Sequence, residues 1–147
     1  MSKIQNFING EWKSAGSGKT LDKVSPVTGK LIYKIPDSDA VDVVLAVQAA
    51  TKAFAAWSAL SHADRAKYLN RIADRIQERL EEFALAETED VGKPLELSRT
   101  LDIPRAVANF RFFAGRLLHH EESSTEMDGK FLNYTLRQPL GVAGLIS

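Results

Sequence analysis

The sequence has no cysteine among its 147 residues. Within these residues, this excludes a disulfide framework, a thiolate metal site and a cysteine nucleophile. Histidine is scarce too, and His62, His119 and His120 have no companion ligands at the spacing of a metal site. The pair His119 and His120 stands near the end of a helical pattern, where a cation interacts favourably with the helix dipole. We therefore expect no catalytic or metal-binding histidine.

Net charge is also absent, because 19 lysines and arginines balance 19 aspartates and glutamates. This balance argues against a nucleic-acid surface, which would need a basic stripe. By inspection, no apolar run reaches the roughly 20 residues of a membrane span, and the first residues are polar. The sequence thus predicts a cytoplasmic globular protein with no nucleic-acid or membrane partner.

Glycine-rich loops that cradle nucleotide phosphates are missing as well. Residues 15–20 read AGSGKT, but Lys13 stands where the phosphate-loop motif requires its first glycine. Pro26 and a β-type pattern follow this stretch instead of a helix, and no G-x-G-x-x-G motif occurs. We interpret residues 15–20 as a surface loop.

The N-terminal part carries β signals. Residues 7–12 predict a short strand that ends at a turn, and residues 23–35 predict an extended segment bent at Thr28 and Gly29. Pro26 stands beside this bend, where a missing hydrogen-bond donor does least harm. A small β element is therefore expected before the first helix.

Three helical regions follow the β element. The first begins behind the acidic cap at residues 37–39, and its apolar residues recur at helical spacing from Val43 to Trp57. The second begins at Ser61, in a sequence like a capping box, and is expected to run as one helix to Gly92. Its apolar stripe consists of Leu69, Ile72, Ile76, Leu80 and Phe83.

The third helical region, residues 97–117, contains Pro104 inside its apolar pattern. Either the helix kinks at this proline, or Asp102 caps a new helix with Pro104 in its first turn, and we favour the cap. Arg105 then lies among apolar neighbours near a helix start, where a planar guanidinium can hold a carboxylate. Spacing alone favours the plainer interpretation, a surface arginine that pairs with Asp102 or lies over the core.

The last part of the chain returns to β signals. Asp128 and Gly129 predict a hairpin turn, and residues 131–138 alternate between apolar and polar side chains. Residues 141–147 read as a buried strand, typical of the first strand of a parallel sheet. Such a strand needs a crossover and a parallel neighbour. We therefore expect the opening portion of a larger protein.

Several segments together resemble the N-terminal part of the aldehyde dehydrogenase superfamily, in the order and spacing of that family. They are FINGEW at 7–12, SPVTGK at 25–30, ETEDVGKP at 87–94 and GVAGLIS at 141–147. Three more segments resemble the branch that oxidises 2-aminomuconic or 2-hydroxymuconic semialdehydes, namely LDIPR at 101–105, NFRFFA at 109–114 and LHH at 118–120.

The resemblance implies an α/β fold class. Residues 1–147 are then the incomplete N-terminal part of a Rossmann-like NAD-binding domain, built of a small β element, three helices, a β-hairpin arm and the first strand of a parallel sheet. Residues 121–140 contribute to an oligomerisation arm. The strand at 131–138 resembles the part of the arm that pairs across subunits, so a homo-oligomer is expected.

The resemblance also implies a reaction for the intact protein. A cysteine thiolate adds to the aldehyde, the adduct gives hydride to NAD, and water activated by a glutamate releases the acid. In the family, the motif that helps to hold the oxyanion begins at the residue after Ser147, and the cysteine and glutamate lie further on. No catalytic residue is therefore expected in this chain, and the chain alone is expected to be inactive.

A few single residues of this sequence match binding positions of the family. Arg105 matches the arginine that meets a substrate carboxylate in the muconic semialdehyde branch. Ile146 and Ser147 match positions along the nicotinamide half of the cofactor. The Val24 carbonyl and Asp90 match a monovalent-cation site of some members. NAD is the expected cofactor, and NADP stays open because the ribose-reading residues lie downstream.

Two alternatives stay open. The intact protein is a broader aldehyde or betaine-aldehyde dehydrogenase, or the chain is a non-catalytic helical interaction module that stands alone. The apolar segment at 141–147 argues against the second alternative, because an exposed apolar edge invites aggregation.

Overall fold

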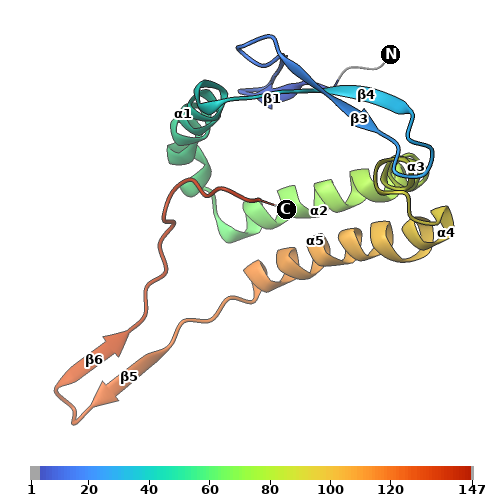
Figure 1. Ribbon diagram of the computed structural model, residues 1–147. Coiled ribbons are helices and arrows are strands. Elements are labelled where there is room, and N and C mark those ends of the chain that lie inside the picture. The colour runs from blue at the N-terminus through green and yellow to red at the C-terminus, as the bar shows by residue number, and fades with distance from the viewer. Residues whose placement is uncertain (1–3, 147) are drawn as a thin grey trace.

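The structure is a computed structural model that describes residues 4–146. Three two-stranded antiparallel sheets accompany a set of helices, of which α2 (His62–Glu78) and α5 (Ile103–Leu118) run side by side (Figure 1). The N-terminal strands lie across from this helix pair, and the last hairpin projects away from it (Figure 1). The mixed helix and strand content confirms the expected α/β class.

The N-terminal β element consists of two hairpins. Strands β1 (Asn6–Ile8) and β2 (Glu11–Lys13) are joined by Asn9 and Gly10, whose φ angles are 56° and 81°. The prediction of a single strand at 7–12 was therefore wrong, because an Asn-Gly pair readily takes positive φ and reverses the chain. Strands β3 (Thr20–Val24) and β4 (Leu31–Pro36) form the second hairpin, with the turn where Thr28 and Gly29 predicted it.

Helix α1 (Ala40–Ser58) begins at the predicted acidic cap. Asp39 is the N-cap, and the Asp42 side chain accepts hydrogen bonds from the backbone N–H of Asp39 and of Gly16. This buried carboxylate ties the first turn of α1 to the preceding loop. By length and composition alone, α1 is apolar enough to cross a membrane, although the sequence predicted no such run. Most of its large apolar side chains are exposed.

The expected long second helix is two helices. Helix α2 ends at Glu78 and α3 (Leu80–Val91) follows, because Arg79 leaves the helical conformation with φ −111° and ψ 26°. The prediction of one continuous helix was wrong at this residue. Its ends were predicted correctly, since Ser61 caps α2 and Gly92 ends α3 in the left-handed conformation.

Small side chains form the core between α2 and α5. Ala66 and Ala73 of α2 and Val107 and Ala114 of α5 are all buried. Small residues let two helix backbones approach closely, so the packed face of α2 follows its alanines. The predicted stripe is not the buried face throughout, because Ile72 remains exposed.

Pro104 sits in a nearly continuous helical run. The short helix α4 (Leu95–Leu97) passes into a π-helical turn, η1 (Ser98–Asp102), and then into α5. Asp102 is the N-cap residue of α5 and Pro104 lies in the first turn, as predicted, but Asp102 has helical φ and ψ and its side chain makes no capping hydrogen bond. The π turn instead bonds the N–H of Ile103 to the carbonyl of Ser98, which accommodates the missing donor of Pro104.

The last hairpin forms where Asp128 and Gly129 predicted it. Strands β5 (Ser124–Met127) and β6 (Phe131–Tyr134) pair in antiparallel fashion, and every residue of both is exposed. Residues 135–146 contain no strand, so the strand expected at 141–147 is not formed in the described part. Strand geometry requires a hydrogen-bonded neighbour, and the described residues provide none there. Ser147 lies outside the described residues.

Candidate functional site

Arg105 lies in the first turn of α5 with an exposed side chain. Among residues 4–146 it makes no hydrogen bond or ion pair. The plainer interpretation paired it with Asp102, but the Asp102 carboxylate binds Lys93 instead, with 2.6 Å between Oδ2 and Nζ. The Arg105 guanidinium is therefore available to a carboxylate from outside the described residues.

Lys93 links the segments on both sides of this helix start. Its Nζ donates to Asp102 and, at 3.3 Å, to Oε1 of Glu87 on α3. The hydrogen bond to Asp102 raises the pKa of Lys93 above its usual value. The lysine thus neutralises the carboxylate that would otherwise compete for Arg105.

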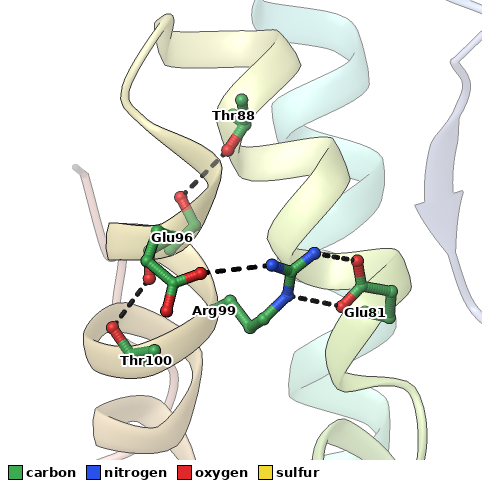
Figure 2. A network of polar contacts seen from close by, with 6 residues as sticks. Glu81, Thr88, Glu96, Arg99 and Thr100 are labelled. Carbon is green, nitrogen blue, oxygen red and sulfur yellow. Dashed lines mark hydrogen bonds and ion pairs between the residues drawn. The ribbon is translucent and has the colours of Figure 1, made fainter.

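Arg99, a second arginine near this helix start, is fully engaged within the protein (Figure 2). Its guanidinium binds both carboxylate oxygens of Glu81 on α3, at 2.8 and 2.5 Å, and one oxygen of Glu96 at 3.2 Å. These contacts raise the pKa of Arg99 and lower that of Glu81. Arg99 thus links η1 to α3, whereas Arg105 makes no hydrogen bond or ion pair among residues 4–146.

Asp90 and Val24, the predicted cation-binding pair, belong to two elements that contact each other. The Asp90 carboxylate on α3 accepts a hydrogen bond from the Tyr33 hydroxyl at 2.5 Å and pairs with Lys23 at 3.0 Å. Lys23 directly precedes Val24 at the register shift in β3. These contacts hold the β3–β4 hairpin on the C-terminal part of α3.

The pKa values at this contact follow from the short hydrogen bond. The bond from Tyr33, helped by Lys23, lowers the pKa of Asp90. The same bond raises the pKa of Tyr33 to about 12, because ionisation would remove the donated proton beside a carboxylate. A lysine ammonium already pairs with Asp90, so a cation at this position would compete with Lys23. The cation site at Val24 and Asp90 stays a prediction.

Ile146, the predicted cofactor contact within the described residues, is fully exposed and lies in a segment without secondary structure. Its predicted companion Ser147 is not described. The assignment of these two positions to the cofactor therefore stays a prediction.

Sequence reasoning missed the contacts that organise these sites. Tyr33 and Asp90 are far apart in the sequence, and neither spacing nor charge pairs them. The same holds for the Arg99 contact to Glu81. In contrast, Lys93 and Asp102 both fall inside segments that the sequence singled out.

The helix pair and the flanking hairpins define a mixed helix and strand protein. Comparison with known families then identifies it: the chain belongs to the aldehyde dehydrogenase family, whose model matches residues 12–147.

Its curated relatives include 2-aminomuconic semialdehyde dehydrogenases. That of Danio rerio is 50% identical over 145 residues, and that of Homo sapiens is 46% identical over 145 residues. Each alignment covers 98% of this chain and 29% of the relative. The chain thus spans less than a third of the length of these relatives.

Solved structures agree with this assignment. A crystal structure of PnpE in complex with nicotinamide adenine dinucleotide matches with a TM-score of 0.84 and 46% identity, over 89% of this chain and 27% of that one. An indole-3-acetaldehyde dehydrogenase in complex with NAD+ matches with a TM-score of 0.88 and 34% identity, over 94% and 28%. The fold is therefore that of the N-terminal part of aldehyde dehydrogenase structures.

Proposed function

We propose that this chain is the N-terminal portion of an NAD-dependent aldehyde dehydrogenase that oxidises a muconic-type semialdehyde to the acid. The observation that carries the proposal is the 50% identity, over 98% of the chain, to a 2-aminomuconic semialdehyde dehydrogenase. The activity belongs to the complete protein, because this chain covers 29% of that relative.

Arg105 is the substrate-binding residue in this proposal. A muconic-type semialdehyde carries a carboxylate, and a guanidinium binds a carboxylate through two parallel hydrogen bonds. Lys93 supports this role because its ammonium group pairs with the Asp102 carboxylate. Arg105 therefore has no counter-ion among the described residues.

The remaining functions are proposed on the same family relationship. NAD, which is present in the PnpE complex, accepts the hydride when bound, with Ile146 and Ser147 beside its nicotinamide half. The exposed hairpin of β5 and β6 pairs with its counterpart in a homo-oligomer, since its edges are unpaired among the described residues. We place the enzyme in the cytoplasm.

The substrate assignment is tested by Arg105→Ala in the complete enzyme. We expect kcat/KM for a carboxylate-bearing semialdehyde to fall about 10- to 100-fold, which corresponds to the loss of a charge-assisted hydrogen-bonded pair. An uncharged aldehyde should be oxidised at an unchanged rate, and Arg105→Lys should lose less than Arg105→Ala. Arg71→Ala, which removes an exposed arginine from α2, is the matched control.

An equal loss on charged and uncharged aldehydes, or no loss, would contradict the role of Arg105. A broad aldehyde oxidiser would then be the better assignment, as represented by a long-chain-aldehyde dehydrogenase of Acinetobacter at 42% identity.

The chain alone is proposed to be inactive, because the family's nucleophilic cysteine has no counterpart in it. The purified 147-residue chain should form no NADH from NAD and a semialdehyde. Steady NADH formation by this chain would contradict the proposed mechanism rather than the choice of substrate.

A further inference from the structure

Three arginines meet in a hollow at one end of the helix pair. The hollow has a volume of about 420 Å³ and is lined by Arg65 of α2, Arg116 of α5 and Arg137 of the segment after β6. At this end α2 begins and α5 ends, and the chain passes again as it returns from the hairpin (Figure 1). Three segments far apart in the sequence thus bring guanidinium groups to one place.

The lining of the hollow is strongly basic. Besides the three arginines it includes His62 and His120, and it contains no aspartate or glutamate. Glu122 lies at its edge, where one carboxylate oxygen accepts from the backbone N–H of Arg137 at 3.2 Å and lies 3.7 Å from Nε2 of His120. One carboxylate does not balance three guanidinium groups, so the hollow keeps an excess of positive charge.

Arg65 has no counter-ion among residues 4–146. Its Nε is buried and has no hydrogen-bond partner among residues 4–146. A buried donor of a charged group is costly when unpaired, and nearly all such donors have a partner in folded proteins. Arg116 is only partly engaged, since its Nη1 donates to the carbonyl of His119 at 3.2 Å. Among the described residues, Nε of Arg65 thus has no acceptor and Arg116 has one, the carbonyl of His119.

We propose that this hollow binds an oxyanion, that is, a carboxylate or phosphate group. Oxygen atoms of such a group match the forked donors of guanidinium. The oxyanion comes either from a small molecule in solution or from an acidic side chain of the complete polypeptide. The site is separate from Arg105, which precedes Arg116 by a helix length of about 16 Å.

The test uses the complete protein, with inorganic phosphate as the probe at constant ionic strength. Binding is measured by isothermal titration calorimetry in the parent and in Arg137→Gln. The Arg137 side chain is exposed, and circular dichroism checks that the variant is folded. We expect saturable binding in the parent and about tenfold weaker binding in Arg137→Gln, the loss of one charge-assisted hydrogen bond. Arg71→Gln, an exposed arginine of α2 outside the hollow, should bind phosphate like the parent.

A second measurement covers an oxyanion supplied by the polypeptide itself. In that case phosphate does not bind, but Arg65→Gln and Arg137→Gln lower the thermal unfolding midpoint by more than Arg71→Gln does, and added salt reduces the difference. Either result supports an oxyanion in the hollow and identifies its source. Two results together would overturn the proposal. The first is that phosphate binding is not saturable, or is as strong in Arg137→Gln as in the parent. The second is that Arg65→Gln and Arg137→Gln have the same thermal unfolding midpoint as Arg71→Gln.

Discussion

Gly92, at the C-terminal end of α3, packs against the turn between β3 and β4. Replacing Gly92 by alanine tests this contact. Gly92 has φ 76°, and its N–H donates to the carbonyl of Thr88 at 2.9 Å. A Cβ atom added here would lie 2.9 Å from Cγ of Pro26 and 3.1 Å from Cγ2 of Val27. The first distance is too short for carbon atoms, and the proline ring cannot rotate away.

The expected cost has two parts. The left-handed conformation costs about 1–2 kcal/mol for an alanine. Moving the turn away from the new methyl group costs about 1–3 kcal/mol more, as in other overpacked contacts. The sum is about 2–5 kcal/mol for Gly92→Ala. Gly29→Ala is the matched control, since Gly29 has φ 68° in the same turn and a Cβ there would meet nothing within 4 Å. It should cost about 1–2 kcal/mol, the backbone part alone.

Native-state hydrogen exchange of the complete protein measures both effects locally. Gly92→Ala should lower protection in residues 80–91 and also in residues 20–36, because it separates the two elements. Gly29→Ala should lower protection only in residues 20–36. The reasoning is refuted if the two variants change the same peptides by the same amount.

Two further predictions concern the hydrogen bond between Tyr33 and Asp90. Tyrosinate absorbance should show Tyr33 ionising near pH 12, above the ordinary tyrosine pKa of about 10, and this late step should be missing in Tyr33→Phe. The raised pKa of Tyr33 means that its contribution to stability is present below about pH 10 and is lost as the pH rises towards 12. The lowered pKa of Asp90 has the opposite sign: its contribution is present above about pH 4 and is lost as the pH falls further, and Asp90→Asn should remove this acid dependence in unfolding measurements.

Local signals in the sequence predicted where elements begin and turn. Asp39, Ser61 and Gly92 mark helix ends in the structure because a side-chain oxygen or a left-handed glycine satisfies backbone groups locally. Asn9 and Gly10 carried a turn signal of the same kind, which a strand interpretation of residues 7–12 overlooked. In contrast, no such signal marks the break at Arg79, where a charged residue with good helix propensity leaves the helix.

Charge partners and packed helix faces could not be predicted from the sequence, because they depend on contacts between residues that are not neighbours in it. Arg105 was singled out from its neighbours, but that it lacks a counter-ion depends on Lys93 reaching Asp102. The buried face of α2 follows Ala66 and Ala73 rather than the larger stripe, because helix proximity favours small side chains. The sequence thus located the arginine, while only the structure explained why it is free.

The apolar surface of α1 links the fold to the family assignment. Val41, Val44 and Leu45 are about half exposed or more, as is most of the helix, and Leu145 and Ile146 are almost completely exposed. Large exposed apolar patches mark interfaces in folded proteins. The relatives have more than three times the aligned length, since the alignment covers 29% of each, so further polypeptide is the simplest cover for these residues.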